Sequence, residues 1–179
     1  MNTNVKKLTG SAIMLALALV LPFFTMQIPA IGKMLCPMHF PVLLCGMLFG
    51  PLWGGAVGFV APLLRFAIFG MPIIFPTGIS MSAELLTYGL VIGIMVKFLP
   101  KKIGFAYISL FTAMIAGRIV WALARTFLTF FGGEAFTFAA FVAGGFVEAA
   151  PGILLQILLI PVLYLAFRRA GLALNTKNL

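Results

Sequence analysis

The stretch that decides the fold is GFAYISLFTAMIAGRIVWALARTFLTFF, residues 104–131, in which the charged side chains are Arg118 and Arg125. At a helical rise of about 1.5 Å per residue, it is long enough to cross the roughly 30 Å hydrocarbon core of a membrane. The rest of the chain is similar: of 179 residues, 63% are hydrophobic and 8% are charged, whereas soluble domains carry roughly a quarter charged residues. The sequence therefore predicts an integral membrane protein.

The composition also excludes some kinds of chemistry. The chain has three acidic residues, all Glu, and no Asp, so Asp-rich magnesium sites and Walker B-type ATP hydrolysis are ruled out. Cys36 and Cys45 form no CxxC pair, and His39 is the histidine near them; we interpret both as small core residues. We expect no metal, no cofactor and no enzymatic activity.

Pro, Gly and charged residues divide the chain into six apolar segments. Together they predict an all-α membrane bundle that forms one domain over residues 1–179, with these spans: 8–27, 37–50, 51–70, 80–99, 104–131 and 137–167. Lys6 and Lys7 before an apolar run resemble the start of a signal peptide, but no A-x-A-like site follows, so we expect a first membrane helix.

Six crossings place both termini on one side of the membrane. Lys33 lies in a loop on the opposite side. Most other basic residues lie on the side of the termini: Lys6, Lys7, Lys97, Lys101, Lys102, Arg168, Arg169 and Lys177. Because Lys and Arg are enriched in cytoplasmic loops, we expect both termini in the cytoplasm of a prokaryotic cell, with the chain in its plasma membrane.

Five charged side chains lie in the hydrocarbon region, away from the ends of the predicted spans: Arg65, Glu84, Arg118, Arg125 and Glu148. A charge in hydrocarbon costs at least about 2.5–3.5 kcal/mol, so such residues usually face a protein interior and serve a ligand or pathway. Counted along the helices, Arg118 lies near the midplane and the other four lie roughly 6–10 Å toward the outer side. Because these side chains lie at a similar depth in the outer half, we expect a cavity that opens outward. A pore would also need polar groups along the inner half, and the sequence shows no matching line of them there.

Helical spacing groups these residues further. Arg118, Trp121 and Arg125 share one helix face, and so do Glu84 and Tyr88. His39 starts the second helix on the outer side, and Glu134 lies in the last outer loop. The predicted substrate-binding residues are His39, Arg65, Glu84, Tyr88, Arg118, Trp121, Arg125 and Glu148.

Three arginines against two glutamates leave a positive charge unbalanced in these spans. A buried cation without a partner is expensive, and a ligand with a carboxylate or phosphate would supply the missing anion. The alternative is that these side chains pair with one another and merely lock the bundle.

The outer connection 70–80 is too apolar for an ordinary solvated loop. We expect Met71, Ile74 and Phe75, with Ile73, to form a lid over the cavity; residues 28–37 have the same character. Alternatively, both connections rest at the membrane interface.

Five short stretches form a pattern along the first half of the chain. They are Ala12-x-x-x-Ala16, Pro37-Met38-His39-Phe40-Pro41-Val42, Gly50-Pro51-Leu52-Trp53-Gly54, Phe69-Gly70-Met71-Pro72 and Ala83-Glu84-Leu85-x-x-Tyr88-Gly89. With its size, six predicted helices and basic ends, the chain resembles the substrate-binding S components of energy-coupling factor (ECF) vitamin transporters over residues 8–170.

The resemblance implies a subunit that captures a vitamin or vitamin precursor at the outer face. It would associate with a transmembrane coupling subunit and two ATPases, with Ala12 and Ala16 as partner-contact residues, and would tip in the membrane to carry its site inward. The polar residues favour a small anion, nominally pantothenate. Riboflavin, a pyridoxine-type vitamin, a folate-like compound and a queuosine precursor remain open, as does another class, a small stand-alone transporter or channel.

Overall fold

The computed structural model describes residues 2–25, 28–100, 102–131 and 136–175. Within these ranges the chain is helical and contains no strand, which confirms the predicted all-α class. The elements are α1 (Thr3–Val20), η1 (Leu21–Thr25), α2 (Pro29–Leu35), α3 (His39–Phe49), α4 (Pro51–Phe69), η2 (Ile74–Gly78), α5 (Ile79–Phe98), α6 (Ile103–Phe131), α7 (Phe138–Val142), η3 (Ala143–Val147) and α8 (Ala150–Arg169).

Five helical stretches of the described chain are long and apolar enough to cross a membrane: Thr3–Phe24, Pro51–Phe69, Ile74–Phe98, Ile103–Phe130 and Ala150–Arg169. The remaining predicted span, 37–50, corresponds to α3, whose 11 residues cover only about 16 Å at the helical rise. The count of six crossings therefore stays a prediction.

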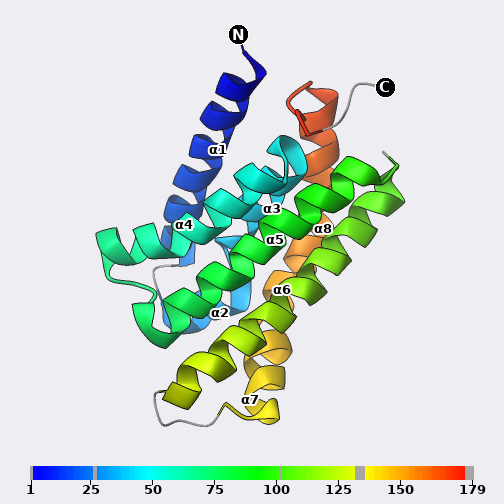
Figure 1. The fold of residues 1–179 in the computed structure, drawn as a ribbon. Coiled ribbons are helices and arrows are strands. Elements are labelled where there is room, and N and C mark those ends of the chain that lie inside the picture. The colour runs from blue at the N-terminus through cyan, green and yellow to red at the C-terminus, as the bar shows by residue number, and fades with distance from the viewer. Residues whose placement is uncertain (1, 26–27, 101, 132–135, 176–179) are drawn as a thin grey trace.

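Both ends of the chain lie at the same end of the bundle (Figure 1). We call it the terminal end. The short helices α2 and α7 lie toward the other end, which we call the distal end (Figure 1). The cytoplasmic placement of the terminal end stays a prediction.

The short helix α3 forms the centre of the bundle. Ten of its 11 residues are buried, and it packs against α1, α4, α5 and α8. Neighbouring helices, not lipid, therefore surround its backbone, which allows a helix too short to span the bilayer to remain stable inside it.

Glycines bring α3, α4 and α5 into backbone contact. A Cβ atom on Gly46 would lie 2.6 Å from the carbonyl oxygen of Gly89, and one on Gly54 would lie 2.5 Å from the Cα of Gly46. No larger residue fits at these positions without separating the helices. Such small-residue contacts are the usual means of close helix packing in membranes.

The segment after α8 folds back and closes the terminal end. The backbone amides of Leu174 and Asn175 donate to the carbonyl of Leu48 at 2.7 and 2.8 Å. The side-chain Nδ2 of Asn175 donates to the carbonyls of Gly46 and Gly93 at 3.3 and 2.9 Å. These bonds tie the C-terminal segment to α3 and α5.

The helix bounds differ from the predicted ones in three places. The first helix begins at Thr3 instead of residue 8, because the side chain of Asn2 caps it by accepting from the amide of Asn4. The first outer connection contains the short helix α2, which begins with Pro29 at its first turn. The predicted segment 137–167 is not one helix: it breaks between η3 and α8, just before Pro151, whose ring cannot continue a helix from the preceding turn.

Candidate functional site

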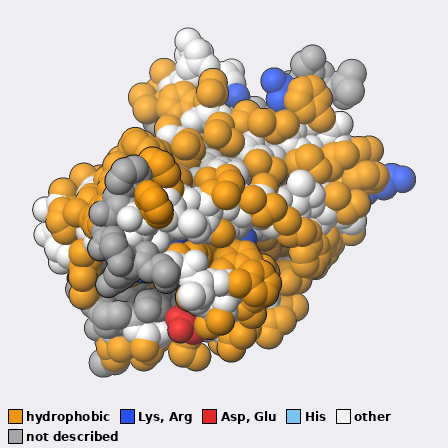
Figure 2. Space-filling model, turned by 60° about the horizontal axis from the view of Figure 1, so that its bottom comes forward, with side chains coloured by type: hydrophobic (Ala, Val, Ile, Leu, Met, Phe, Trp, Pro, Cys, Tyr) orange, Lys and Arg blue, Asp and Glu red, His pale blue; other side chains and the backbone are white. Residues whose placement is uncertain are grey.

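A cavity of about 760 Å³ lies toward the distal end of the bundle. This volume falls in the range of roughly 300–1,000 Å³ that is typical of small-molecule sites. Figure 2 turns this end forward and shows hydrophobic side chains over most of the face, with acidic atoms among them. The described lining comes from η1, α2, the loop before α3, the outer parts of α4, α5 and α6, the 71–77 connection, and the α7–η3 segment.

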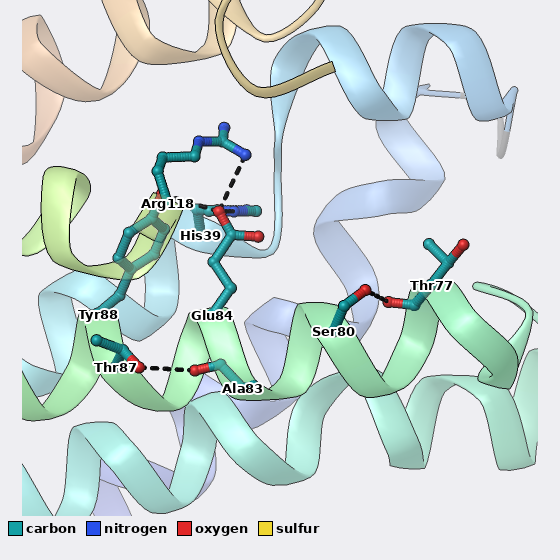
Figure 3. Close-up of polar contacts among 8 residues, drawn as sticks. All are labelled: His39, Thr77, Ser80, Ala83, Glu84, Thr87, Tyr88 and Arg118. Carbon is teal, nitrogen blue, oxygen red and sulfur yellow. Dashed lines mark hydrogen bonds and ion pairs between the residues drawn. The ribbon is translucent and has the colours of Figure 1, made fainter. Parts of the chain in front are cut away.

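Glu84 is the centre of a buried polar cluster on the cavity wall (Figure 3). Its side chain is 3% exposed, and its Oε1 lies 3.0 Å from the Nη1 of Arg118. Tyr88, one helical turn further along α5, donates its hydroxyl to the same oxygen at 2.9 Å, and the Nε2 of His39 lies 3.7 Å from it. The Glu84 carboxylate therefore balances the charge of Arg118.

The guanidinium of Arg118 also stacks on Trp121. The Cζ of Arg118 lies 5.8 Å from the ring centroid of Trp121, which is one turn further along α6. Trp121 in turn meets Phe136 edge to face at 5.6 Å and Phe141 at 6.2 Å. An aromatic cluster thus joins α6 to the α7–η3 segment and holds the Arg118 guanidinium from its other side.

Arg125 is anchored differently from Arg118. Its Nη1 donates to the hydroxyl of Thr77 at 2.8 Å, which links α6 to the 71–77 connection. Among the described residues, no carboxylate lies within ion-pair distance of Arg125. Its charge is therefore left without a described counter-ion.

Arg65 turns toward α1. Its Nη1 donates to the backbone carbonyl of Leu19 at 2.8 Å, and its Cζ lies 5.6 Å and 5.4 Å from the ring centroids of Phe23 and Phe69. Those rings contact each other edge to face at 5.0 Å. Arg65 lines the cavity and also ties η1 to the end of α4.

Four buried nitrogen atoms of the described chain have no hydrogen-bond partner, and all belong to residues that line the cavity. They are both ring nitrogens of His39, the Nε of Arg118 and the Nε of Arg125. Buried polar atoms are nearly always hydrogen-bonded, and leaving one unpaired costs about 1–3 kcal/mol. Both Nε atoms carry a hydrogen and can only donate, so the cavity-lining residues hold buried donors that the described chain leaves unused.

The structure brings seven of the eight predicted substrate-binding residues to this one cavity. Tyr88 is not on the lining and instead supports Glu84 from behind. Glu148 lies on the wall with an exposed side chain, and Glu134 lies outside the described residues. The role of these residues in binding stays a prediction.

Of the predicted lid residues, Met71 and Ile73 line the cavity, and Ile74 and Phe75 do not. The chain bends at Phe75, whose φ of −112° and ψ of 130° are extended inside η2. Pro72 and Thr77, which were not predicted as lid residues, also lie on the wall. The apolar character of the connection was visible in the sequence, but the bend that selects which side chains face inward was not.

Cys36 is a cavity residue that the sequence analysis assigned to the core. It lies in the loop before α3 with a φ of 48°, a left-handed conformation that is uncommon outside glycine. Burial raises the pKa of its thiol to about 11, although the neighbouring Arg118 opposes this shift. The thiol therefore stays protonated and weakly reactive.

The fold and the cavity define a helical protein with helices long enough to cross a membrane and a cavity of small-molecule size. A family model, ECF transporter, substrate-specific component, matches residues 6–164. The chain belongs to this family, as the sequence pattern predicted, and is thus a substrate-binding membrane subunit of an ECF transporter. No curated protein and no solved structure matches the chain.

Proposed function

We propose that this chain captures a small anionic vitamin or vitamin precursor, nominally pantothenate, in the 760 Å³ cavity. The observation that carries the proposal is the set of unpartnered donors in two wall residues, the buried Nε atoms of Arg118 and Arg125. Three arginines and two glutamates line the described part of the cavity, so one positive charge is in excess. A carboxylate or phosphate ester would accept from these donors and balance that charge.

The ATP-driven step of import belongs, in this proposal, to partner subunits: a transmembrane coupling subunit and two ATPases. Ala12 and Ala16 are exposed on one face of α1, so neither is used for packing within the chain. This supports their assignment to the face that contacts the coupling subunit. The chain would lie in a prokaryotic plasma membrane with six crossings and the terminal end in the cytoplasm.

The lid of the proposed site is the 71–73 segment. Met71, Pro72 and Ile73 line the cavity, and Met71 and Ile73 are 39% and 63% exposed. Apolar side chains that lie on the wall and are left this exposed by their neighbours are suited to covering a bound ligand. Ile74 and Phe75 belong to the same connection but do not line the cavity.

Riboflavin, a pyridoxine-type vitamin, a folate-like compound and a queuosine precursor are the alternative ligands. The aromatic cluster around Trp121 favours those with a flat ring, whereas the unpartnered arginine nitrogens favour those with an acid. A stand-alone transporter is the alternative of another class, and it predicts uptake by the purified chain in vesicles that contain no ATPase.

The experiment that tests the proposal identifies the small molecule that accompanies the chain. The protein is purified in detergent, the bound compound is released and named by mass spectrometry, and its affinity is measured by calorimetry. We expect an anion whose affinity falls when Arg125 is replaced by Gln, and is unchanged in the control Lys102→Gln, since Lys102 is exposed and far from the cavity lining. A cationic ligand, or equal affinity in both variants, would contradict the proposal.

A further inference from the structure

We infer that the cavity binds its ligand in one orientation, with the acidic group at Arg125 and Thr77 and a neutral hydrogen-bonding group at the His39–Glu84–Arg118 cluster. This inference rests on the proposed function and specifies the substrate class: a monoanion with a neutral polar end. It follows from how each of the three cavity arginines is already compensated.

The charge of Arg118 is already compensated within the chain. The Glu84 carboxylate lies 3.0 Å from its Nη1, and Trp121 covers the guanidinium at 5.8 Å. An acid placed here would also meet the negative charge of Glu84. What the cluster offers is hydrogen bonding: the Nε of Arg118 as a donor and the two unpartnered ring nitrogens of His39, of which one donates and one accepts when the ring is neutral.

Arg65 is compensated too, although by neutral groups. One of its terminal nitrogens is bound to the Leu19 carbonyl at 2.8 Å, and two aromatic rings, those of Phe23 and Phe69, lie within 5.6 Å of its Cζ. Arg65 is also absent from the set of buried nitrogens without a partner. Its contacts assign it to holding η1 against α4.

Arg125 is the cavity arginine that the described residues leave most in need of an anion. It has one hydroxyl partner, Thr77, at 2.8 Å, and a buried Nε–H without any partner. Because the Thr77 oxygen accepts from Arg125, its own hydrogen remains to be donated, and no described group takes it. An anionic oxygen here would accept from the Arg125 Nε–H and the Thr77 hydroxyl together.

The spacing of the two positions sets the length of the ligand. Arg118 and Arg125 are seven residues apart on α6, which corresponds to about 10 Å along the helix axis. The neutral group and the acid should therefore be separated by a similar distance. A second acid at the far end would meet Glu84, and Glu148 adds a further negative charge to the wall, so a dianion is disfavoured.

Pantothenate and pantothenol test this orientation, because pantothenol has a neutral hydroxymethyl group in place of the carboxylate. Calorimetry on the purified chain in detergent, at concentrations up to the millimolar range, compares the two compounds on wild type, Arg125→Gln and Arg65→Gln. We expect wild type to bind pantothenate more tightly. Arg125→Gln should weaken pantothenate about 10- to 100-fold, as expected for a lost charged hydrogen bond, and leave pantothenol almost unchanged. Arg65→Gln removes a cavity charge but no unpartnered donor, so it should lower the preference for the acid less than Arg125→Gln does.

A second pair of variants tests the inference without removing a charge. Thr77→Val removes the hydroxyl at constant shape and should weaken pantothenate about 5- to 10-fold while sparing pantothenol; Thr77→Ser should restore binding. Thermal unfolding of each variant identifies any that fails to fold. If Arg125→Gln does not fold, the two Thr77 variants test the position of the acidic group in its place.

Three results would overturn the inference: wild type with no preference for the acid, equal losses of both compounds in Arg125→Gln, or a larger loss of the preference in Arg65→Gln than in Arg125→Gln. Failure of the proposed function has another signature. If pantothenate binds only at millimolar concentration but its preference still depends on Arg125 and Thr77, the acid position stands and pantothenate is not the natural ligand. If both compounds bind tightly and without preference, the proposed function stands and the acid position at Arg125 and Thr77 is wrong.

Discussion

Replacing Glu84 by Gln is the perturbation whose outcome the structure determines best. The carboxylate is almost fully buried and meets Arg118 at 3.0 Å and Tyr88 at 2.9 Å. The amide keeps the shape and can still accept from both partners, so the change removes mainly the charge. What remains is the guanidinium of Arg118, which is 8% exposed and then has no described counter-ion.

Removing one partner of a buried ion pair costs about 3–5 kcal/mol, because it leaves an uncompensated charge. Arg118 borders the cavity, where water can solvate it in part, so we expect the lower end, about 3 kcal/mol. Tyr88→Phe is the matched control in the same cluster. It removes one hydrogen bond to a charged group and should cost less, about 1.5–3 kcal/mol.

The measurement is the free energy of unfolding in detergent micelles, obtained by titration with a denaturing detergent while helicity is followed by circular dichroism. Glu84→Gln, Arg118→Gln and the double variant complete a double-mutant cycle with wild type. Because the double variant removes both charges of this pair, its cost should fall short of the summed single costs by about 2–3 kcal/mol. Single costs below about 1 kcal/mol, or costs that simply add, would refute the view that Glu84 and Arg118 depend on each other.

Three further outcomes are expected. Gly89→Ala should destabilise the chain by about 3 kcal/mol or more, because its Cβ would overlap the α4 backbone. The control Gly104→Ala, on α6 with open space around it, should be neutral or stabilise by up to about 1 kcal/mol. Equal effects of the two variants in unfolding titrations would contradict the close backbone contact between α4 and α5. Ala12→Trp should abolish uptake by cells that express the coupling subunits and leave ligand binding by the isolated chain unchanged; loss of both would indicate misfolding. In a Cys45→Ala background, Cys36 should react slowly with iodoacetamide near neutral pH and about tenfold faster per pH unit up to its pKa of about 11, because the raised pKa keeps the thiol protonated below that value; a rate that levels off near pH 8.5 would show an ordinary thiol.

The long apolar segments made most of the helices predictable. Residues 51–70, 80–99 and 104–131 differ from α4, α5 and α6 by one residue at most at either end, because Gly, Pro and Lys punctuate the sequence where those helices stop. The family was also recognisable, since its pattern consists of local motifs on these same helices.

The break before α8 and the helix α2 were not predictable to the same degree. A run of apolar residues from 137 to 167 carries no signal for where a helix is interrupted except Pro151, which is also compatible with the first turn of a helix. In the structure, the glycines at 144 and 145 lie against Trp121, so contacts between distant residues decide the local geometry there.

At the site, residue type predicted which side chains lie at the cavity better than it predicted how they pair. Buried charges had to face the interior, and the structure brings Arg65, Arg118 and Arg125 to one cavity. Which of them is satisfied by a carboxylate, a carbonyl or a hydroxyl depends on rotamers and on neighbours far apart in the sequence, such as Leu19 and Thr77. No periodicity encodes those partners.

The closure of the terminal end has a consequence for ions as well as for the ligand. There the backbones of Gly46, Gly54 and Gly89 touch, and Asn175 occupies the carbonyls of Gly46 and Gly93. A water molecule needs enough room and about two to four polar partners to occupy a site, and the backbone contacts at this crossing leave no such room. We therefore expect a molecule that enters at the distal end to leave by the same mouth, and protons and sodium to find no hydrated passage through the crossing. We also expect idle copies of the protein to leave the ion gradients of a cell intact.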